Sequence, residues 1–419
     1  MGAVPQPELE RLEQLGSADL VVGILDSEHA PGASDPVAVV REALAELSKV
    51  ARAVVVCNNS ANGSPDSTNS EGSGNDQSLA VFSYNLSPEG PAGGPQQSMS
   101  SAYRSVLAVG GKLGVRACGV IGSNLQTATP QWIHRLLQPV IDLAFDLVAP
   151  HYTRGKMEGL LNASILSPLH RALYGVQLQN PMGPDFGLSG RLLQRVLGQG
   201  GTPRRGSQGD LVGSIASIAA SDGFQACETH LGARTQPPTD WLNLSSLLAE
   251  ILGPVFLEIE RQAAFWQGIR GSKPVPQFGA PEAISDDAGP VDVHPMIESF
   301  QLGAQSLQDV WGLVLPPTTL LELRKLSRLA PAQFRMPDEL WVRIVYDFAL
   351  GHRLQAISRD HLLRSITPLY LGWIASFALN VETAGPAERE SRMERLCRAY
   401  EVNKPYLVSR WRWPDRFNP

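Results

Sequence analysis

The chain has few cysteines, and none lies in a pattern that binds a metal or forms a redox pair. Only four occur among 419 residues, at positions 57, 118, 227 and 397, and no two have Cys-x-x-Cys spacing. Because three of them lie in apolar stretches, we expect buried thiols rather than disulfides or zinc ligands. Such thiols fit a reducing compartment, so we expect a cytoplasmic protein.

Long apolar runs and several common catalytic motifs are also missing. No apolar run reaches the ~18 residues that a membrane span needs. Residues 1–16 are polar and acidic, without the apolar segment of a signal peptide. The chain contains no Walker loop, no His-Glu-x-x-His and no nucleophile elbow. These absences give no support to a membrane protein, an ATPase, a zinc protease or a serine hydrolase.

Basic residues are in slight deficit. The chain has 35 Lys and Arg against 41 Asp and Glu, a net charge of −6, which argues against a general nucleic-acid binder. Residues 404–413 mix basic and aromatic side chains, but without a wider basic face we expect them to pack on the protein's own surface. We therefore expect no nucleic-acid partner.

The first half of the chain alternates apolar strand patterns with helical ones. The strands are expected at 20–25, 53–57, 79–84 and 115–121, and the helices at 36–50, 98–113 and 130–147. This order predicts an α/β fold, a mostly parallel sheet with helices on both faces. Residues 58–77 are almost wholly small and polar, which predicts a mobile loop. In such a sheet, ligands bind beyond the carboxyl ends of the strands, here near Asp26, residues 58–68 and residues 122–124.

The second half is helical in pattern. A long helix is expected at 242–266, and others near 293–314, 317–328, 338–350, 359–381 and 386–401. Since the chain is too long for one small core, we divide it into an N-terminal extension (1–18), a sheet domain (19–240) and an all-helical C-terminal domain (241–419).

Two isolated carboxylates lie in conspicuous places. Asp185 is in a turn bounded by Gly and Pro (residues 180–191), where the backbone can approach a ligand closely. Asp210 follows Gly209 at the start of an apolar helix, where an anion is stabilised. Asp185 could instead bond its own turn, and Asp210 could be a plain N-cap. Together they suggest a polar ligand such as a sugar.

Five segments, in order and spacing, resemble the glycosyltransferases of the GT-A fold. The likeness is to family-2-like members, the bacterial mannosylglycerate and glucosylglycerate synthases, over residues 19–270. The matching segments are residues 64–68, 122–124 with Trp132 behind them, 151–154, 180–189 and 208–210. The resemblance implies a GT-A Rossmann-like sheet. It also implies an enzyme that moves a hexose from a nucleotide-diphosphate sugar to a small, carboxylate acceptor such as glycerate.

The resemblance also implies roles for individual residues. The nucleoside would be held by Asp26 and Asp66, the diphosphate would lie near Ser123 and Asn124, the sugar would meet Asp185 and Asp210, and the acceptor would be held by Arg154 and Asn162. Asp210 would act as a base or a positioning group, and the planar guanidinium of Arg154 suits a carboxylate. Asp66 could equally be a solvated turn residue and Arg154 a surface residue. Relatives of this type often pair, so a homodimer is a further expectation.

The chain departs from the family where the family binds a metal. The Asp-x-Asp motif, which holds Mg²⁺ or Mn²⁺ against the diphosphate, reads Gly122-Ser-Asn124 here. The Gly-Lys-Gly loop, at residues 93–97, has no lysine, and the metal-binding histidine is replaced by Thr235 and Gln236. His230 is nearby, but a lone histidine at a strand end is more often structural. The ligands of a divalent metal therefore look lost.

Two interpretations remain open. In the first, Arg or Lys from elsewhere neutralises the diphosphate and the protein is a hexosyltransferase. In the second, the protein is a catalytically degenerate relative that binds a nucleotide-sugar or a partner protein. A related nucleotidyltransferase is a third and weaker reading.

Overall fold

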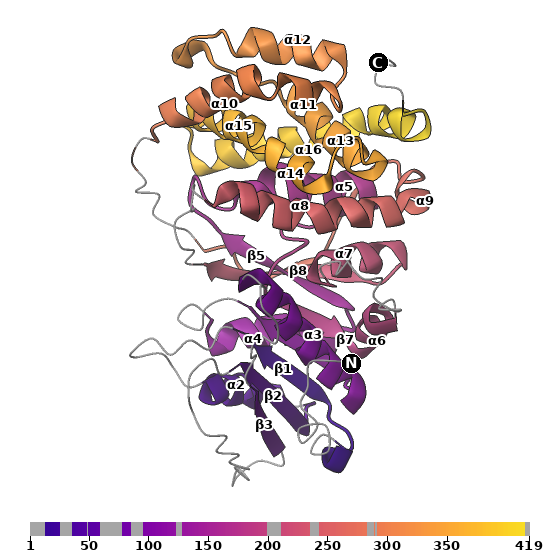
Figure 1. The fold of residues 1–419 in the computed structure, drawn as a ribbon. Coiled ribbons are helices and arrows are strands. Elements are labelled where there is room, and N and C mark those ends of the chain that lie inside the picture. The colour runs from indigo at the N-terminus through magenta and orange to yellow at the C-terminus, as the bar shows by residue number, and fades with distance from the viewer. Residues whose placement is uncertain are drawn as a thin grey trace. The chain divides into compact units, whose positions relative to one another are not determined.

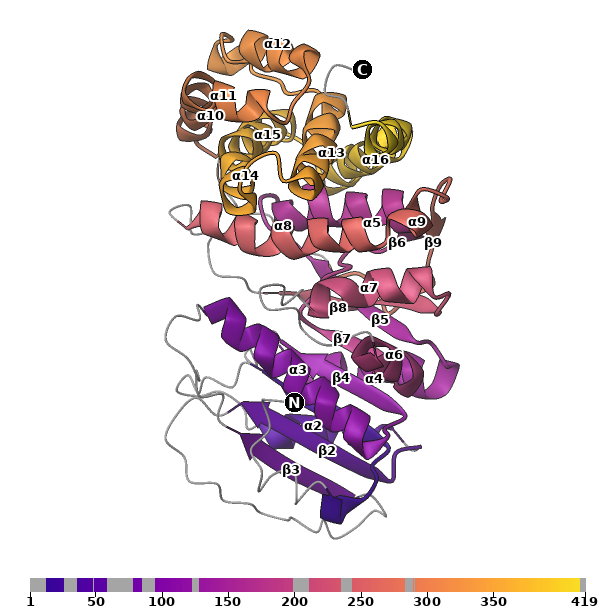
Figure 2. The ribbon, with the colours of Figure 1, turned by 45° about the vertical axis from the view of Figure 1, so that its right-hand side comes forward.

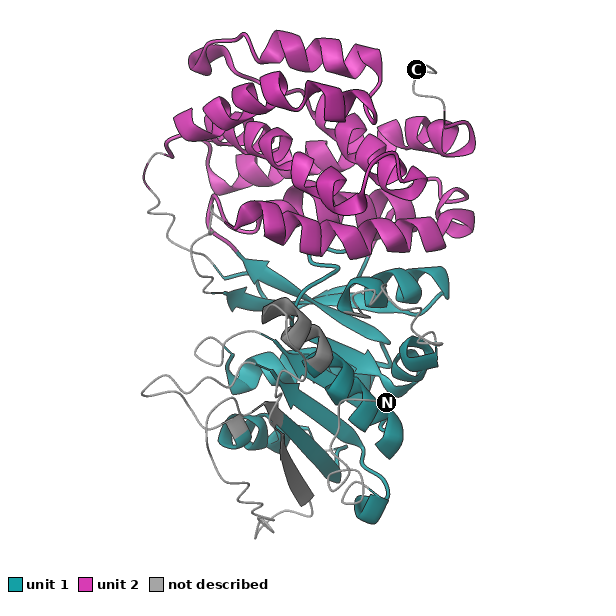
Figure 3. Cartoon of the chain, in the orientation of Figure 1, with its two compact units in different colours: residues 1–153, 178–235, 275–283 teal, residues 154–177, 236–274, 284–419 magenta. Residues whose placement is uncertain are grey.

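The computed structural model describes residues 13–25, 36–47, 49–58, 78–84, 95–122, 128–198, 211–234, 243–282, 289 and 291–414. The chain divides into two compact units (Figure 3). Unit 1 comprises residues 1–153, 178–235 and 275–283, and unit 2 comprises residues 154–177, 236–274 and 284–419. This division differs from the single boundary at residue 240 expected from the sequence, because residues 154–177 pack with the helices and residues 275–283 with the sheet.

Unit 1 is built on a sheet that has eight strands in the described residues (Figure 1). The order is β10-β8-β5-β7-β4-β1-β2-β3. All neighbours pair in parallel except β7, which is antiparallel to both β4 and β5. The strands are β1 (Leu20–Ile24), β2 (Arg52–Asn58), β3 (Ser78–Tyr84), β4 (Ala117–Ile121), β5 (Leu147–Thr153), β7 (Phe186–Ser189), β8 (Ala226–Ala233) and β10 (Gln277–Phe278). Strands β1 and β4 are buried at every position, as their continuous apolar runs predict for a covered parallel sheet.

Helices cover both faces of this sheet (Figure 2). One face packs against α2 (Pro36–Ala45) and α4 (Pro130–Leu143), and the other against α3 (Pro95–Leu113), α6 (Gly190–Gly198) and α7 (Leu211–Ser221). Two strand glycines allow this close packing. A Cβ atom at Gly23 would lie 2.4 Å from Val106 of α3, and one at Gly119 would lie 2.9 Å from Leu137 of α4. The expected mostly parallel α/β sheet with helices on both faces is confirmed.

One predicted helix is shorter than its apolar pattern suggested. The pattern predicted a helix over residues 130–147, but α4 ends at Leu143 because Ala144 adopts a left-handed conformation with φ 58°. Asp146 then lies buried and accepts hydrogen bonds from Ser189 Oγ (2.6 Å) and from the Gln225 N–H (3.1 Å). The apolar residues from Leu147 onward belong to β5 instead.

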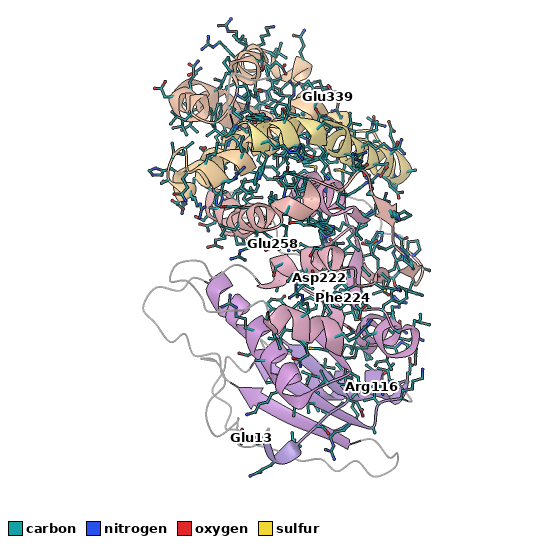
Figure 4. The ribbon with its side chains drawn as sticks, turned by 90° about the vertical axis from the view of Figure 1, so that its right-hand side faces the viewer. Glu13, Arg116, Asp222, Phe224, Glu258 and Glu339 are labelled. Atoms are coloured by element: carbon teal, nitrogen blue, oxygen red, sulfur yellow. The ribbon has the colours of Figure 1, made fainter. Side chains whose placement is uncertain are left out.

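Unit 2 is helical apart from a two-stranded parallel ladder of β6 (Val176–Gln177) and β9 (Lys273–Pro274). Its side chains fill the space among its helices, which include those carrying Glu258 and Glu339 in Figure 4. The helices are η1 (Asn162–Leu166, a π-helix), α5 (Ser167–Tyr174), α8 (Leu244–Arg261), α9 (Ala263–Trp266), α10 (His294–Ser306), α11 (Gln308–Gly312), α12 (Pro317–Leu326), η2 (Pro331–Gln333, a 3₁₀ helix), α13 (Asp338–Leu354), α14 (Arg359–Ser365), α15 (Thr367–Asn380) and α16 (Pro386–Arg412). The expected helical C-terminal region is therefore present.

The core of unit 2 contains many large aromatic side chains, among them Trp341, Trp373 and Tyr400. Helices α14 and α15 form its most apolar stretch. By length and composition alone, Arg359–Asn380 could cross a membrane, with a mean hydropathy of 1.3. That stretch is longer than the sequence analysis allowed for. However, 72% of its apolar window is buried inside the structure, which is how the core helix of a globular domain behaves.

Candidate functional site

Asp185 lies at the centre of the candidate site in unit 1. Its side chain is fully buried, with 0% exposure. The N–H of Gly122 donates to Oδ1 at 2.9 Å, and the hydroxyl of Tyr152 donates to Oδ2 at 2.6 Å. Gly122 directly follows β4, Tyr152 is in β5, and Asp185 precedes β7. Three segments that the sequence analysis singled out separately therefore meet at one carboxylate.

The turn before β7 brings Asp185 to this position. The amide of Asn180 donates to the Pro150 carbonyl at 2.9 Å, and the Gly183 N–H donates to the Asn180 carbonyl at 3.1 Å. A Cβ atom at Gly183 would lie 2.3 Å from Pro150 Cγ. Glycine at this position lets the turn pack directly against β5, which delivers the following aspartate to the end of β4.

Position 122 is closed to any side chain. A Cβ atom there would lie 2.1 Å from the hydroxyl oxygen of Tyr103 and 2.7 Å from the carbonyl oxygen of Pro184. These two atoms are themselves joined, because the Tyr103 hydroxyl donates to that carbonyl at 2.9 Å. The first carboxylate of an Asp-x-Asp motif therefore does not fit here. The space that it would need is occupied by the turn that carries Asp185.

Three features fix the position of Tyr152. A bulge in the pairing of β5 with β8 falls between His151 and Tyr152, and such an irregularity re-aims the following side chain. The ring of Trp132, a buried core residue, lies 6.0 Å from the Tyr152 ring. On another side, the guanidinium carbon of Arg234 lies 5.4 Å from the Tyr152 ring centroid. The hydroxyl that contacts Asp185 is thus positioned by packing.

A second polar cluster lies on β5 and β8. Glu228 is 1% exposed and accepts the N–H of Gln179 and, at 3.2 Å, the amide of Gln277. Burial raises the pKa of Glu228 to about 7. His151 Nδ1 lies 4.0 Å from the Glu228 carboxylate, and its ring stacks on His230 with 4.2 Å between centroids. Burial, followed by the charge of Arg135, lowers the pKa of His230.

The two predicted acceptor residues lie in unit 2. Arg154 Nη1 donates to the Gly159 carbonyl at 3.4 Å. Gly159 has φ +63°, and a Cβ atom there would lie 1.9 Å from Arg154 Nη1, so the glycine makes room for the guanidinium. The Gly159 carbonyl also accepts the N–H of Ala163 at 3.0 Å. Asn162 begins the π-helix η1, a feature that is frequent at functional sites.

The other predicted site residues lie outside the described part of the chain. They are Asp26, Asp66, Ser123, Asn124 and Asp210. The loop at 59–77 and the positions of Thr235 and Gln236 also lie outside it. Their neighbours are as expected, because β4 ends directly before Gly122 and α7 begins at Leu211, the residue after Asp210.

The described residues do not fit a divalent metal in the manner of the family. Among them there is no group of three or more His, Cys, Asp or Glu side chains that could hold a metal ion. Position 122 is sterically closed, both oxygens of Asp185 already accept hydrogen bonds, and His230 stacks on His151. These described groups therefore do not form a metal site.

Sequence reasoning did not identify Arg234, Glu228 or His151 as parts of the site. His151 lies inside the marked segment 151–154, and Arg234 directly precedes Thr235, one of the two residues found in place of the family's histidine, so their positions were a usable signal. Glu228 offers only one hint, a carboxylate inside an otherwise apolar strand. The closure of position 122 depends on Tyr103 and Pro184, which are remote in sequence.

Comparisons with known proteins identify similar solved structures only. No family model matches the sequence, and no curated protein matches it. The glucosyl-3-phosphoglycerate synthase of Mycobacterium tuberculosis, solved with Mn²⁺, UDP-glucose and phosphoglyceric acid, is 16% identical, covers 62% of this chain and 85% of its own, and has a TM-score of 0.35. The mannosyl-3-phosphoglycerate synthase of Rubrobacter xylanophilus is 16% identical. The match covers 64% of this chain and 81% of the synthase, with a TM-score of 0.37. A mycobacterial protein is 18% identical, with 61% and 80% covered and a TM-score of 0.36.

Proposed function

We propose that this chain is a GT-A-type hexosyltransferase that uses a nucleotide-diphosphate sugar and a small carboxylate acceptor, such as glycerate or a phosphorylated glycerate. The observation that carries the proposal is the junction at Asp185. Gly122, Tyr152 and Asp185 come from three separate motif segments and are joined by hydrogen bonds of 2.9 and 2.6 Å. Such convergence at the carboxyl ends of parallel strands is where α/β sheets bind ligands.

The junction supports one role, and the resemblance implies the others. The buried junction orders the exit of β4, next to Ser123 and Asn124, where the diphosphate would lie. The Asp185 carboxylate acts by holding that exit in place, and Asp210, which precedes α7, would meet the sugar and the acceptor. Arg154 and Asn162 would bind the acceptor carboxylate, for which a guanidinium is geometrically suited. Asp26 and Asp66 would contact the nucleoside.

The location and the donor chemistry form part of the same proposal. We propose a cytoplasmic protein, which is supported by the three described free cysteines, Cys118, Cys227 and Cys397. Because position 122 is closed, the proposal requires that the diphosphate be neutralised without the Asp-x-Asp metal.

The experiment is an incubation of the full chain with UDP-, GDP- and ADP-hexoses. Glycerate and 3-phosphoglycerate serve as acceptors, in EDTA and with Mg²⁺ or Mn²⁺. The expected result is formation of a hexosyl acceptor and a free nucleoside diphosphate with one of the donors. Arg154→Ala should raise the KM for the acceptor and leave donor affinity unchanged, because in this proposal the guanidinium binds the acceptor and not the donor. An absence of both turnover and nucleotide binding would contradict the proposal.

One observation favours a second candidate, a nucleotide-sugar-binding protein without transferase activity. The closed position 122 removes the first metal ligand by packing, not only by substitution, which is what a binding protein released from catalysis would tolerate. Nucleotide binding that is unaffected by metal, with no product from any donor and acceptor pair, would identify this candidate.

A further inference from the structure

Arg234 packs on Tyr152 of the Asp185 junction and has no counter-ion among the described residues. It directly follows β8, and it has no ion pair or hydrogen bond within the described residues. Its Nε atom is buried and has no acceptor. A buried donor of this kind is uncommon, because desolvation without a partner carries a free-energy cost. The guanidinium lies over the Tyr152 ring, 5.4 Å from its centroid, and this contact sets its orientation.

Among the described residues, the arginine Arg135 is not available in the way that Arg234 is. Arg135 is already engaged, since its Nη1 donates to the His230 carbonyl at 2.9 Å and lies 3.9 Å from Glu282. The nearest carboxylate of the junction, Asp185, is occupied by Gly122 and Tyr152. Arg234 therefore presents a positive charge that lies over the Tyr152 ring and has no anionic partner among the residues that the structure describes.

We infer that Arg234 binds the diphosphate of the nucleotide and takes the place of a divalent metal. A planar guanidinium can donate two parallel hydrogen bonds to phosphate oxygens. Two features of the chain support this substitution. The metal-motif position is sterically closed at Gly122, and a guanidinium with no partner in the described residues lies over Tyr152, whose hydroxyl shares the Asp185 carboxylate with the Gly122 N–H. The inference rests on the proposed function, because it requires a nucleotide ligand.

The test is calorimetric titration of the full chain with UDP, GDP and ADP, first in EDTA and then with excess Mg²⁺. We expect one nucleotide to bind with the same Kd in both buffers. Arg234→Ala and Arg234→Gln should weaken this binding by about 10-fold to 100-fold, as expected for the loss of hydrogen bonds to a charged group. Arg234→Lys should recover only part of the affinity, because an ammonium group lacks the planar fork.

Two controls separate this role from a structural one. The corresponding nucleoside has no diphosphate, so its affinity should be the same for Arg234→Ala and the wild type. Arg195→Ala makes the same change in net charge on α6, where Arg195 pairs with Asp222, and it should leave the Kd unchanged. Melting curves of each variant establish that it is folded.

Three results would overturn the inference. Nucleotide binding that requires Mg²⁺ would show that a metal is needed. Equal nucleotide affinity for Arg234→Ala and the wild type would show that the guanidinium does not contact the diphosphate, and the proposed function would survive. If the wild type binds none of the three nucleotides in either buffer, the proposed function fails, and the inference fails with it.

Discussion

The hydroxyl of Tyr152 donates a 2.6 Å hydrogen bond to the buried carboxylate of Asp185. Through this bond the end of β5 is tied to the turn before β7, and the second oxygen of Asp185 ties both to the exit of β4. A fully buried carboxylate is tolerated only when it is well hydrogen-bonded. The junction is therefore a structural unit whose parts depend on one another.

Tyr152→Phe should destabilise the protein by about 1–3 kcal/mol, because it leaves one oxygen of a buried carboxylate without its donor. Urea unfolding measures the change. Tyr103→Phe is the matched control, since it removes a hydroxyl that donates to a neutral carbonyl, that of Pro184, and its effect should be smaller. Equal stabilities for Tyr152→Phe and the wild type would contradict a stabilising hydrogen bond between Tyr152 and Asp185.

Gly122→Ala should destabilise the protein by about 1–3 kcal/mol, the usual effect of overpacking a filled site. Gly198→Ala, at the end of α6, is the control, because a Cβ atom there meets no atom within 4 Å. Restoring the motif with Gly122→Asp and Asn124→Asp should therefore not create metal-dependent activity, although the resemblance alone suggests that it would. Gain of activity with Mn²⁺ in that double variant would contradict the conclusion that position 122 has no room for a side chain.

Glu228 should make stability depend on pH. Burial raises its pKa from 4.5 to about 7, so between these pH values the folded state keeps a proton that the unfolded state has released. The stability from Glu228 is thus complete below about pH 4.5 and is lost as the pH rises to about 7. Glu228→Gln should flatten this decline in chemical unfolding measured from pH 4.5 to 8. Glu282→Gln, at an exposed carboxylate, should retain it, and an unchanged slope in Glu228→Gln would count against the assignment.

In unit 2, Asp347→Ala should destabilise the protein by about 3–5 kcal/mol, because it removes the carboxylate that pairs with the buried charge of Arg410. Asp347 is 1% exposed and Arg410 3% exposed, and the two side chains approach to 2.8 Å. Asp360→Ala removes an exposed ion pair with Arg364 and should leave stability nearly unchanged. Thermal unfolding compares the two variants. Similar melting temperatures for both would contradict a buried pair.

Much of the sheet could be predicted from the sequence, because a parallel strand covered on both faces is a continuous apolar run, as at Leu20–Ile24. The end of α4 could not, since Leu147 continues the apolar pattern and only the left-handed Ala144 interrupts it. The antiparallel β7 could not be predicted from local sequence patterns either, because its four residues form a strand through pairing with β4 and β5 on either side.

The candidate site shows the same limit. The position of Asp185 in a Gly- and Pro-bounded turn marked it correctly as a residue of interest, but its full burial depends on Tyr152 and Gly122, 33 and 63 residues away. The loss of the Asp-x-Asp motif was readable from the sequence. That the position is sterically closed was not, because Tyr103 closes it from helix α3.

The central claim is that the exits of β4, β5 and β8 bind a nucleotide diphosphate without a metal. Its most direct test is a crystal structure of the full chain soaked with the bound nucleotide-hexose and Mn²⁺, with anomalous data collected for manganese. The account predicts diphosphate oxygens within about 3 Å of the Arg234 guanidinium and no manganese peak beside Gly122. A manganese ion bridging the diphosphate next to Gly122, or a nucleotide bound away from these strand ends, would contradict it.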